Sequence, residues 1–228
     1  MFQQKVSKGQ KLDGNSFVYH NPHSIGFEMR ENKLNYIQLV SIDPARDNFA
    51  IRIERRYPKE RVVQTVVQYK TKFSQSESGN NTDFKEITDF LDLYAAYWID
   101  TLYVVIEKQP PLKLYNIVQA QHVKSYFMIR MKNMPLLPLI IDQDPKIKGK
   151  YLDAPAYIGD RGIKKWSVKM AYQLLETRQD TFCLDVLNRC PTKLDDLTDT
   201  ICQLEAFCIY HDWAGIHPLT PYTPIVEI

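Results

Sequence analysis

The sequence predicts an α/β fold with a mixed five-stranded sheet flanked by helices. One observation is a set of three consecutive β-rich segments joined by short turns, which is typical of an antiparallel meander. The other is the alternation of helical and apolar segments that follows. A helix that feeds a strand favours parallel pairing, so the sheet is expected to be mixed.

The meander begins with a short apolar run that stops at Asp43, directly before a proline. In the second segment apolar and charged residues alternate, which predicts a half-buried strand with Arg52 and Glu54 on the face away from the core. The third segment is rich in β-branched residues and forms its partner. The three predicted strands are residues 36–43, 48–55 and 62–72.

A polar loop then leads to a helix capped by Thr82 or Asp83. The next apolar run, residues 102–106, is buried on both faces and ends at Glu107. The remaining expected elements are a helix at 114–131, a strand at 136–141, a basic loop at 143–155, a helix at 164–178, one more turn at 183–187 and a helix at 195–210. This order of elements is that of a ribonuclease-H-like layout.

The chain has 228 residues, of which 44% are hydrophobic and 25% charged. This length and composition are typical of one large globular domain with extensions. We predict an N-terminal extension at residues 1–34, with a short strand near 16–19. Residues 35–212 are the expected domain, and residues 213–228 a proline-rich tail. The net charge of +2 says little about partners.

The four cysteines form no CxxC pair and have no histidine at zinc-finger spacing, so buried free thiols are expected. The first residues lack the apolar core of a signal peptide. No apolar run reaches the roughly 18 residues of a membrane span. These features predict an intracellular protein in a reducing compartment.

Acidic residues follow two strands that are expected to be parallel neighbours. Asp43 and Glu107 end strands about 4.8 Å apart, so their carboxylates reach a common point. The last helix adds Asp195, Asp196 and Asp199 in its first turns. Each feature alone has a simpler interpretation, because an aspartate before a proline is common in turns and an acidic first turn suits the helix dipole.

Together these acids predict a site for divalent cations. Clustered carboxylates repel each other, and bound cations relieve the repulsion. Oxygen ligands favour Mg²⁺ or Mn²⁺ over zinc, and two such ions about 4 Å apart clamp a phosphodiester. The chain contains no phosphate-binding glycine loop and no GxSxG motif.

Three segments carry a family resemblance: residues 41–50 (SIDPARDNFA), 105–110 (VIEKQP) and 193–200 (KLDDLTDT). In this order they resemble the motifs of the RuvC-type Holliday junction resolvases, and most closely the poxvirus, large-DNA-virus and fungal mitochondrial branch. Residues 165–168 and 175–180 resemble the segment before the last motif. The resemblance covers residues 39–210. One departure is Ala45, preceded by Pro44, where the family has a glycine turn.

The resemblance implies a homodimeric, Mg²⁺-dependent DNA endonuclease that cuts four-way junctions symmetrically, acting in viral recombination and replication in the host cytoplasm or nucleus. It implies Asp43, Glu107, Asp196 and Asp199 as metal ligands, Asp195 as an auxiliary acid or a substitute metal ligand, and Lys193 as a charge that neutralises the scissile phosphate. The helix at 114–131 is the candidate dimer interface, and the alternative is that this helix only covers the sheet. Lysines expected to contact DNA phosphates are Lys108, Lys113, Lys124, Lys164, Lys165 and Lys169, with Tyr115, Tyr126 and Trp166 as candidates for stacking on bases.

Two other functions remain open from the sequence. One is a catalytically inactive protein of the same fold that binds branched DNA. The other is a different ribonuclease-H-like nuclease that acts on RNA–DNA hybrids or transposon ends. Metal titration and a panel of substrates separate these alternatives.

Overall fold

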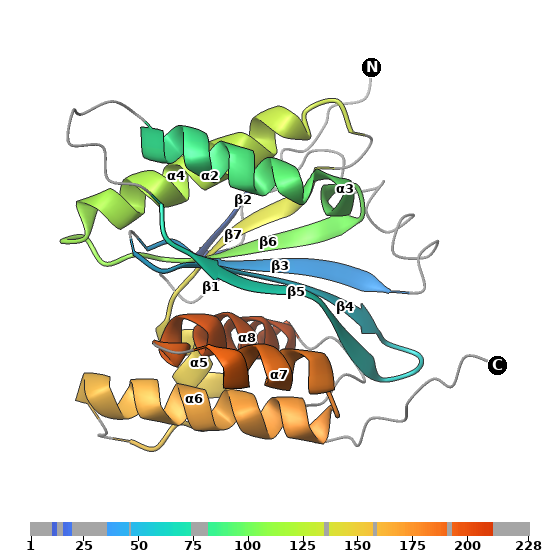
Figure 1. Ribbon diagram of the computed structural model, residues 1–228, viewed down its shortest axis with the longest axis vertical. Helices are drawn as coiled ribbons and strands as arrows, with labels where there is room; N and C mark the ends of the chain where they lie inside the picture. The colour runs from blue at the N-terminus through green and yellow to red at the C-terminus, as the bar shows by residue number, and fades with distance from the viewer. Residues whose placement is uncertain are drawn as a thin grey trace.

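The computed structural model describes residues 11–12, 16–19, 36–45, 47–73, 82–134, 137–156, 159–190 and 193–211. A central sheet is covered by helices on both faces (Figure 1). Its strands are β3 (Ile37–Asp43), β4 (Phe49–Tyr57), β5 (Val62–Thr71), β6 (Thr101–Glu107) and β7 (Leu139–Gln143). They run in the order β7-β6-β3-β4-β5.

The pairing of these strands confirms the predicted mixed sheet. β3, β4 and β5 form the antiparallel meander, and β3, β6 and β7 pair in parallel. Two short strands, β1 (Lys11–Leu12) and β2 (Ser16–Tyr19), extend the sheet beyond the five predicted strands, because β2 pairs antiparallel with β7. The expected strand near 16–19 is therefore present, and it lies at the β7 edge.

The helices divide between the two faces of the sheet (Figure 1). One face carries α2 (Thr82–Leu93), α3 (Ala95–Trp98) and α4 (Leu114–Arg130). The other carries α5 (Lys146–Tyr151), α6 (Gly159–Thr177), α7 (Thr181–Arg189) and α8 (Leu194–Tyr210). Two predictions were wrong in extent: α5 lies within the expected basic loop, and the single turn expected at 183–187 is the full helix α7.

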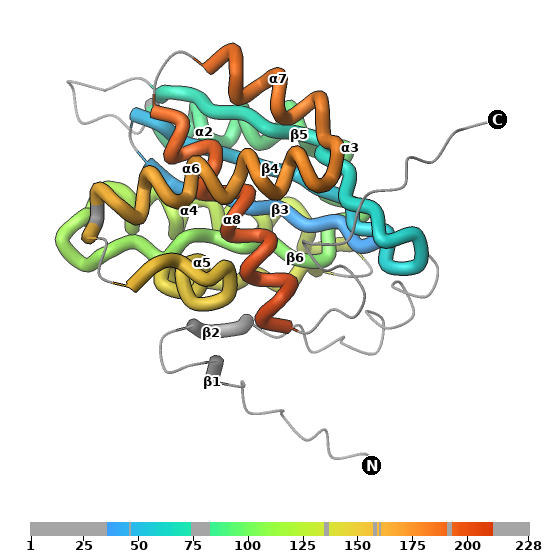
Figure 2. The backbone as a smooth tube through the Cα atoms, turned by 90° about the horizontal axis from the view of Figure 1, so that it is seen from below, coloured from blue at the N-terminus to red at the C-terminus, as the bar shows by residue number. Residues whose placement is uncertain are grey.

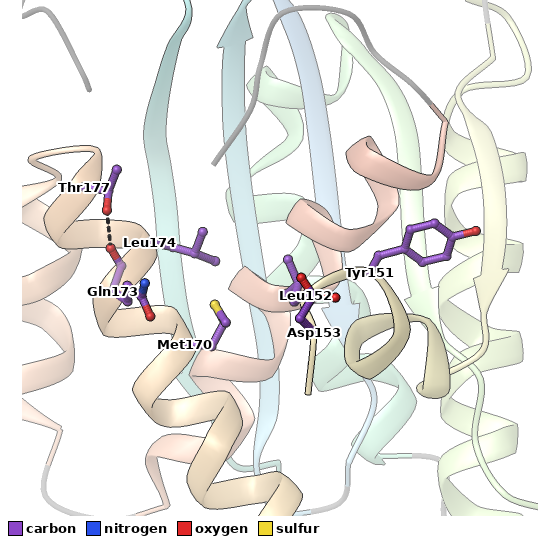
Figure 3. A pocket seen from close by; sticks show the side chains of 7 residues that line it. All are labelled: Tyr151, Leu152, Asp153, Met170, Gln173, Leu174 and Thr177. Carbon is purple, nitrogen blue, oxygen red and sulfur yellow. Dashed lines mark hydrogen bonds between the residues drawn. The ribbon is translucent and has the colours of Figure 1, made fainter. Parts of the chain in front are cut away.

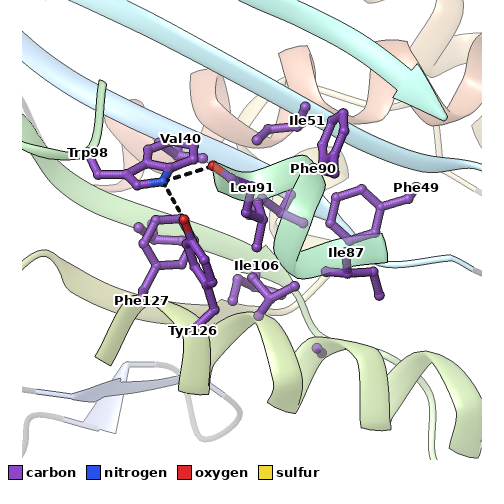
Figure 4. Close-up of a cluster of buried hydrophobic side chains, with 14 of the residues drawn as sticks. Val40, Phe49, Ile51, Ile87, Phe90, Leu91, Trp98, Ile106, Tyr126 and Phe127 are labelled. Carbon is purple, nitrogen blue, oxygen red and sulfur yellow. Dashed lines mark hydrogen bonds between the residues drawn. The ribbon is translucent and has the colours of Figure 1, made fainter. Parts of the chain in front are cut away.

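An apolar core fills the space between the sheet and the α2–α4 layer (Figure 4). Alternate residues of β3 and β6, such as Val40 and Ile106, point into it and are fully buried. The Trp98 indole donates to the Leu91 carbonyl and to the Tyr126 hydroxyl, which satisfies its N–H inside this layer. Burial of apolar area of this kind is the main source of stability of the fold.

The face beneath α8 is more polar, and here the sequence prediction for β4 was wrong. Arg52, Glu54 and Arg56 do not face solvent but are fully buried. Arg56 Nη2 lies 2.8 Å from Glu205 Oε2 on α8, and Arg52 Nε lies 2.7 Å from Glu54 Oε2. The alternation of apolar and charged residues predicts one solvent-exposed face. In the structure α8 covers that face, and the buried charges neutralise one another.

The structure also contains a pocket outside the predicted acidic site. A pocket of about 230 Å³ lies between α6 and the end of α5, lined in part by Tyr151, Met170 and Leu174 (Figure 3). None of the predicted acidic ligands lines it, so it is not the candidate site.

In the described part of the chain no helix is both long and apolar enough to cross a membrane.

Candidate metal centre

Strand alternation sends two carboxylates toward α8. Leu39 and Ser41 of β3 face α8, where Leu39 packs near Leu204 and the Ser41 hydroxyl donates to Gln203 Oε1 at 2.9 Å. Asp43 continues this alternation. β6 is parallel to β3 with Ile42 opposite Ile106, so Glu107 ends its strand on the same face.

The first turns of α8 complete a cluster of three acids. One carboxylate oxygen from each of Asp43, Glu107 and Asp199 lies within 4.8 Å of the others. Figure 2 shows α8 crossing the sheet on this face, and α8 packs on β3. Three elements that are distant in sequence therefore bring their acids to one point. Such an oxygen-only donor set suits a hard divalent cation.

The electrostatics of Asp43 fit a group that needs a cation. Asp43 is only 8% exposed. Burial raises its pKa well above the ordinary value, and repulsion from Glu107 raises the pKa further. A bound cation would offset both effects, because it stabilises the charged form of each carboxylate.

Lys148 of α5 is part of this centre, and the sequence analysis missed it. Its Nζ lies 2.7 Å from Glu107 Oε2 and 3.2 Å from Asp199 Oδ1. Burial alone would lower the pKa of Lys148, but the charges of Glu107 and Asp199 outweigh burial and raise it. Asp144-Pro145 was the available signal, because aspartate and proline are typical of helix starts.

The other two acids of α8 have different surroundings. Asp195 pairs with Lys164, whose Nζ lies 2.5 Å from Asp195 Oδ2. Burial, and then the charge of Asp195, raise the pKa of Asp196 to about 6. Asp196 Oδ2 is buried and has no hydrogen-bond partner among the described residues. Asp196 thus lies beside the cluster with an unsatisfied oxygen, whereas Asp195 is already paired.

Neutral side chains hold two of the clustered carboxylates. The Ser167 hydroxyl of α6 donates to Asp199 Oδ1 at 2.6 Å, and Gln109 Nε2 donates to Asp43 Oδ1 at 3.3 Å. Lys193 is exposed and stands at the start of α8 in a left-handed backbone conformation, with φ of 48°. Neither Pro44 nor Ala45 has a positive φ, so β3 leaves the site without the turn that a glycine would permit.

Five of the six lysines predicted to contact DNA are exposed, namely Lys108, Lys113, Lys164, Lys165 and Lys169. The prediction for Lys124 needs correction, because this side chain is buried and its Nζ lies 2.6 Å from Asp142 Oδ2. Of the aromatic candidates, Tyr126 belongs to the apolar core and bonds Asp92. Tyr115 donates a hydrogen bond to Asp83, and Trp166 packs against the apolar cluster formed by α5, α6, α7 and α8.

Comparison with known proteins identifies structures with a similar fold. No family model matches the chain. Uncharacterized protein 97L of Invertebrate iridescent virus 3 is 22% identical over 197 residues, which is 86% of this chain and 91% of that protein. Fowlpox virus resolvase, solved with substrate Holliday junction DNA, superposes with a TM-score of 0.52 at 22% identity, over 77% of this chain and 98% of that one. The chain has the fold of the Holliday junction resolvases.

A second resolvase branch supports the same assignment of fold. T. thermophilus RuvC, also solved with a Holliday junction substrate, gives a TM-score of 0.51 at 10% identity and covers 78% of this chain and 98% of that chain. The predicted ribonuclease-H-like sheet with flanking helices is therefore confirmed. Within this resolvase fold, the three clustered acids come from the segments whose motifs the sequence analysis singled out.

Proposed function

We propose that the chain is a metal-dependent, structure-selective endonuclease that resolves four-way DNA junctions by paired symmetric nicks. The observation that supports this most directly is the convergence of Asp43, Glu107 and Asp199 on one point. The resolvase fold adds the substrate class, because similar structures were solved with Holliday junction DNA. We place the nuclease in residues 35–212.

The residues present fit a divalent metal centre. Asp43, Glu107 and Asp199 supply oxygens, and the unsatisfied Asp196 Oδ2 is the fourth donor that we propose. Asp195 serves as an auxiliary acid. Mg²⁺, with Mn²⁺ as a substitute and two ions per site, would activate water and stabilise the leaving oxygen of a phosphodiester.

The basic residues of the site balance the negative charge of its carboxylates and of a bound phosphate. Lys148 neutralises Glu107 and Asp199 when no cation is bound, and its ammonium stays within reach of a phosphate brought to those carboxylates. Lys193, at the exposed start of α8, adds positive charge to the same edge. Lys164 neutralises Asp195 through their ion pair.

We propose that the exposed lysines near the site bind the DNA backbone. Lys108 follows Glu107 directly, and Lys164, Lys165 and Lys169 lie on α6, whose Ser167 contacts Asp199. Contacts of this kind give affinity and salt dependence without reading the base sequence.

We also propose a homodimer, because symmetric cutting of a four-way junction needs two active sites. α4 is the candidate interface. Its outer face exposes Leu114 (71%) and Val118 (48%) near its start and Met128 (58%) and Ile129 (64%) near its end, apolar side chains that a second copy would cover. The similarity to a protein of a large DNA virus supports action at viral replication sites inside the host cell, in the cytoplasm or nucleus.

The test is cleavage of a labelled four-way junction by the purified full chain in Mg²⁺ or Mn²⁺. We expect symmetric nicks from the wild type, and no nicks but unchanged junction binding from Asp43→Asn. Asp89→Asn, at an exposed acid of α2, is the matched control and should cut normally. An inert wild type that binds junctions would favour the non-catalytic binder. Preference for RNA–DNA hybrids or transposon ends would favour another nuclease of this fold.

A further inference from the structure

Gln109 joins the metal centre to α4 through its side-chain amide. Its Nε2 donates to Asp43 Oδ1 at 3.3 Å and to the Glu107 carbonyl at 3.2 Å. Its Oε1 accepts from Asn116 Nδ2 on α4 at 3.1 Å. One neutral side chain therefore contacts one acid of the cluster, the backbone of a second, and the helix on the opposite face of the sheet.

The surroundings fix the orientation of this amide. The nitrogen of Gln109 faces two acceptors and its oxygen faces a donor, so an inverted amide would lose these hydrogen bonds. Asn116 is anchored in turn, because its neighbour Tyr115 donates to Asp83 Oδ2 on α2 at 2.6 Å. The position of the Gln109 amide is thus set by packed helices and not by an isolated loop.

A neutral donor does something for Asp43 that a cation cannot. Lys148 is the cationic side chain beside the acidic cluster, and its ammonium contacts and neutralises Glu107 and Asp199. At Asp43 a second cation would compete with a bound metal, whereas an amide N–H orients the carboxylate and leaves its charge intact. Outer groups that orient ligands in this way strengthen metal binding.

We propose that Gln109 is a positioning residue that holds the Asp43 carboxylate ready for the divalent cation, and that Asn116 supports it from α4. This inference rests on the proposed function, in which Asp43 is a metal ligand. It makes α4 a fourth determinant of the geometry of the centre, in addition to β3, β6 and α8.

The experiment measures Mn²⁺ affinity directly, from the magnetic resonance signal of free Mn²⁺, in the full chain without DNA. Gln109→Met keeps the side-chain length but removes both hydrogen-bonding groups. We expect it to weaken Mn²⁺ binding roughly 10- to 100-fold, the usual effect of losing a group that orients a metal ligand. Asn116→Ala should weaken binding less. Gln121→Ala, at an exposed glutamine of α4, should leave the affinity unchanged.

The double variant separates positioning from a general loss of structure. Asn116 is proposed to act only through Gln109, so adding Asn116→Ala to Gln109→Met should weaken binding no further. Thermal unfolding without metal checks that each variant is folded.

Three results would overturn the inference in distinguishable ways. Unchanged affinity in folded Gln109→Met, with a wild type that binds Mn²⁺ through Asp43, removes the positioning role alone. Additive effects in the double variant remove the link to α4. A wild type whose Mn²⁺ binding is absent, or is unaffected by Asp43→Asn, removes the metal centre and with it both proposals.

Discussion

Lys148→Met tests whether the acidic centre depends on an internal cation when no metal is bound. Lys148 is buried, with Nζ 2.7 Å from Glu107 Oε2 and 3.2 Å from Asp199 Oδ1. Methionine keeps most of the apolar contact and removes the ammonium group, with its charge and its hydrogen bond to Glu107. Loss of one partner of a buried ion pair costs about 3–5 kcal/mol, and two carboxylates lose their partner here, so we expect the upper part of this range.

Metal should reverse much of that loss. A cation present at 100 times its dissociation constant stabilises the folded state by about 2.7 kcal/mol. Lys148 also competes with the metal for Glu107 and Asp199, so its removal should tighten Mn²⁺ binding. Lys148→Met is therefore expected to gain more stability from Mn²⁺ than the wild type does.

The assay is denaturant unfolding at pH 7, with and without Mn²⁺, for the wild type, Lys148→Met and Lys148→Arg. The arginine variant keeps the charge and should lose less stability than the methionine variant. A metal-free Lys148→Met protein within about 1 kcal/mol of the wild type would refute the reasoning, because breaking a buried pair has a larger cost.

Three further predictions concern pH, the buried ion pairs and DNA binding. The raised pKa values of Asp43 and Asp196 (about 6 for Asp196) mean that these carboxyls bind extra protons in the folded state, so they add stability to the metal-free protein as pH falls from 7 to 5, whereas His211, whose pKa burial lowers to about 4, removes stability over the same range. Asp196→Asn removes one of the stabilising contributions, so in thermal unfolding the variant should lose stability relative to the wild type as pH falls; parallel profiles would contradict it. Glu205→Gln should lower the free energy of unfolding by about 3–5 kcal/mol, because it weakens the ion pairs of Glu205 with two buried arginines; a near-wild-type denaturation midpoint would count against this. Lys169→Ala should reduce the salt dependence of junction binding by about 0.9 in logarithmic slope, with Lys85→Ala on the opposite face as the unaffected control; equal slopes would exclude the phosphate contact.

The strands and the main acids were predictable because their signals are local. Apolar runs that end at Asp43 and Glu107 mark buried strands directly, and strand alternation then fixes which face the acids share. Lys148 was not predictable in the same way, since α5 is only six residues long and shows no helical periodicity. Its place between two carboxylates depends on how β7 and α5 turn back toward α8.

The buried charges on β4 show a second limit. An alternating strand predicts one polar face, but it does not say whether solvent or another helix covers that face. Arg52 and Arg56 are fully buried because Glu54 and Glu205 neutralise them. The partner Glu205 lies some 150 residues further along the chain, so only the folded arrangement reveals the pairing.

These buried ion pairs help to position the acidic centre, because they fix the register of α8. An apolar interface lets a helix slide or rotate at modest cost, whereas paired charges permit one register, because any other leaves buried ions unpaired. Glu205 fixes the later turns of α8 to β4, and Gln203 fixes its middle to Ser41 of β3. The second turn of the same rigid helix presents Asp199 to Asp43. The polar layer beneath α8 therefore limits where Asp199 can stand, while the apolar core on the α2–α4 side stabilises the sheet from which Asp43 and Glu107 project.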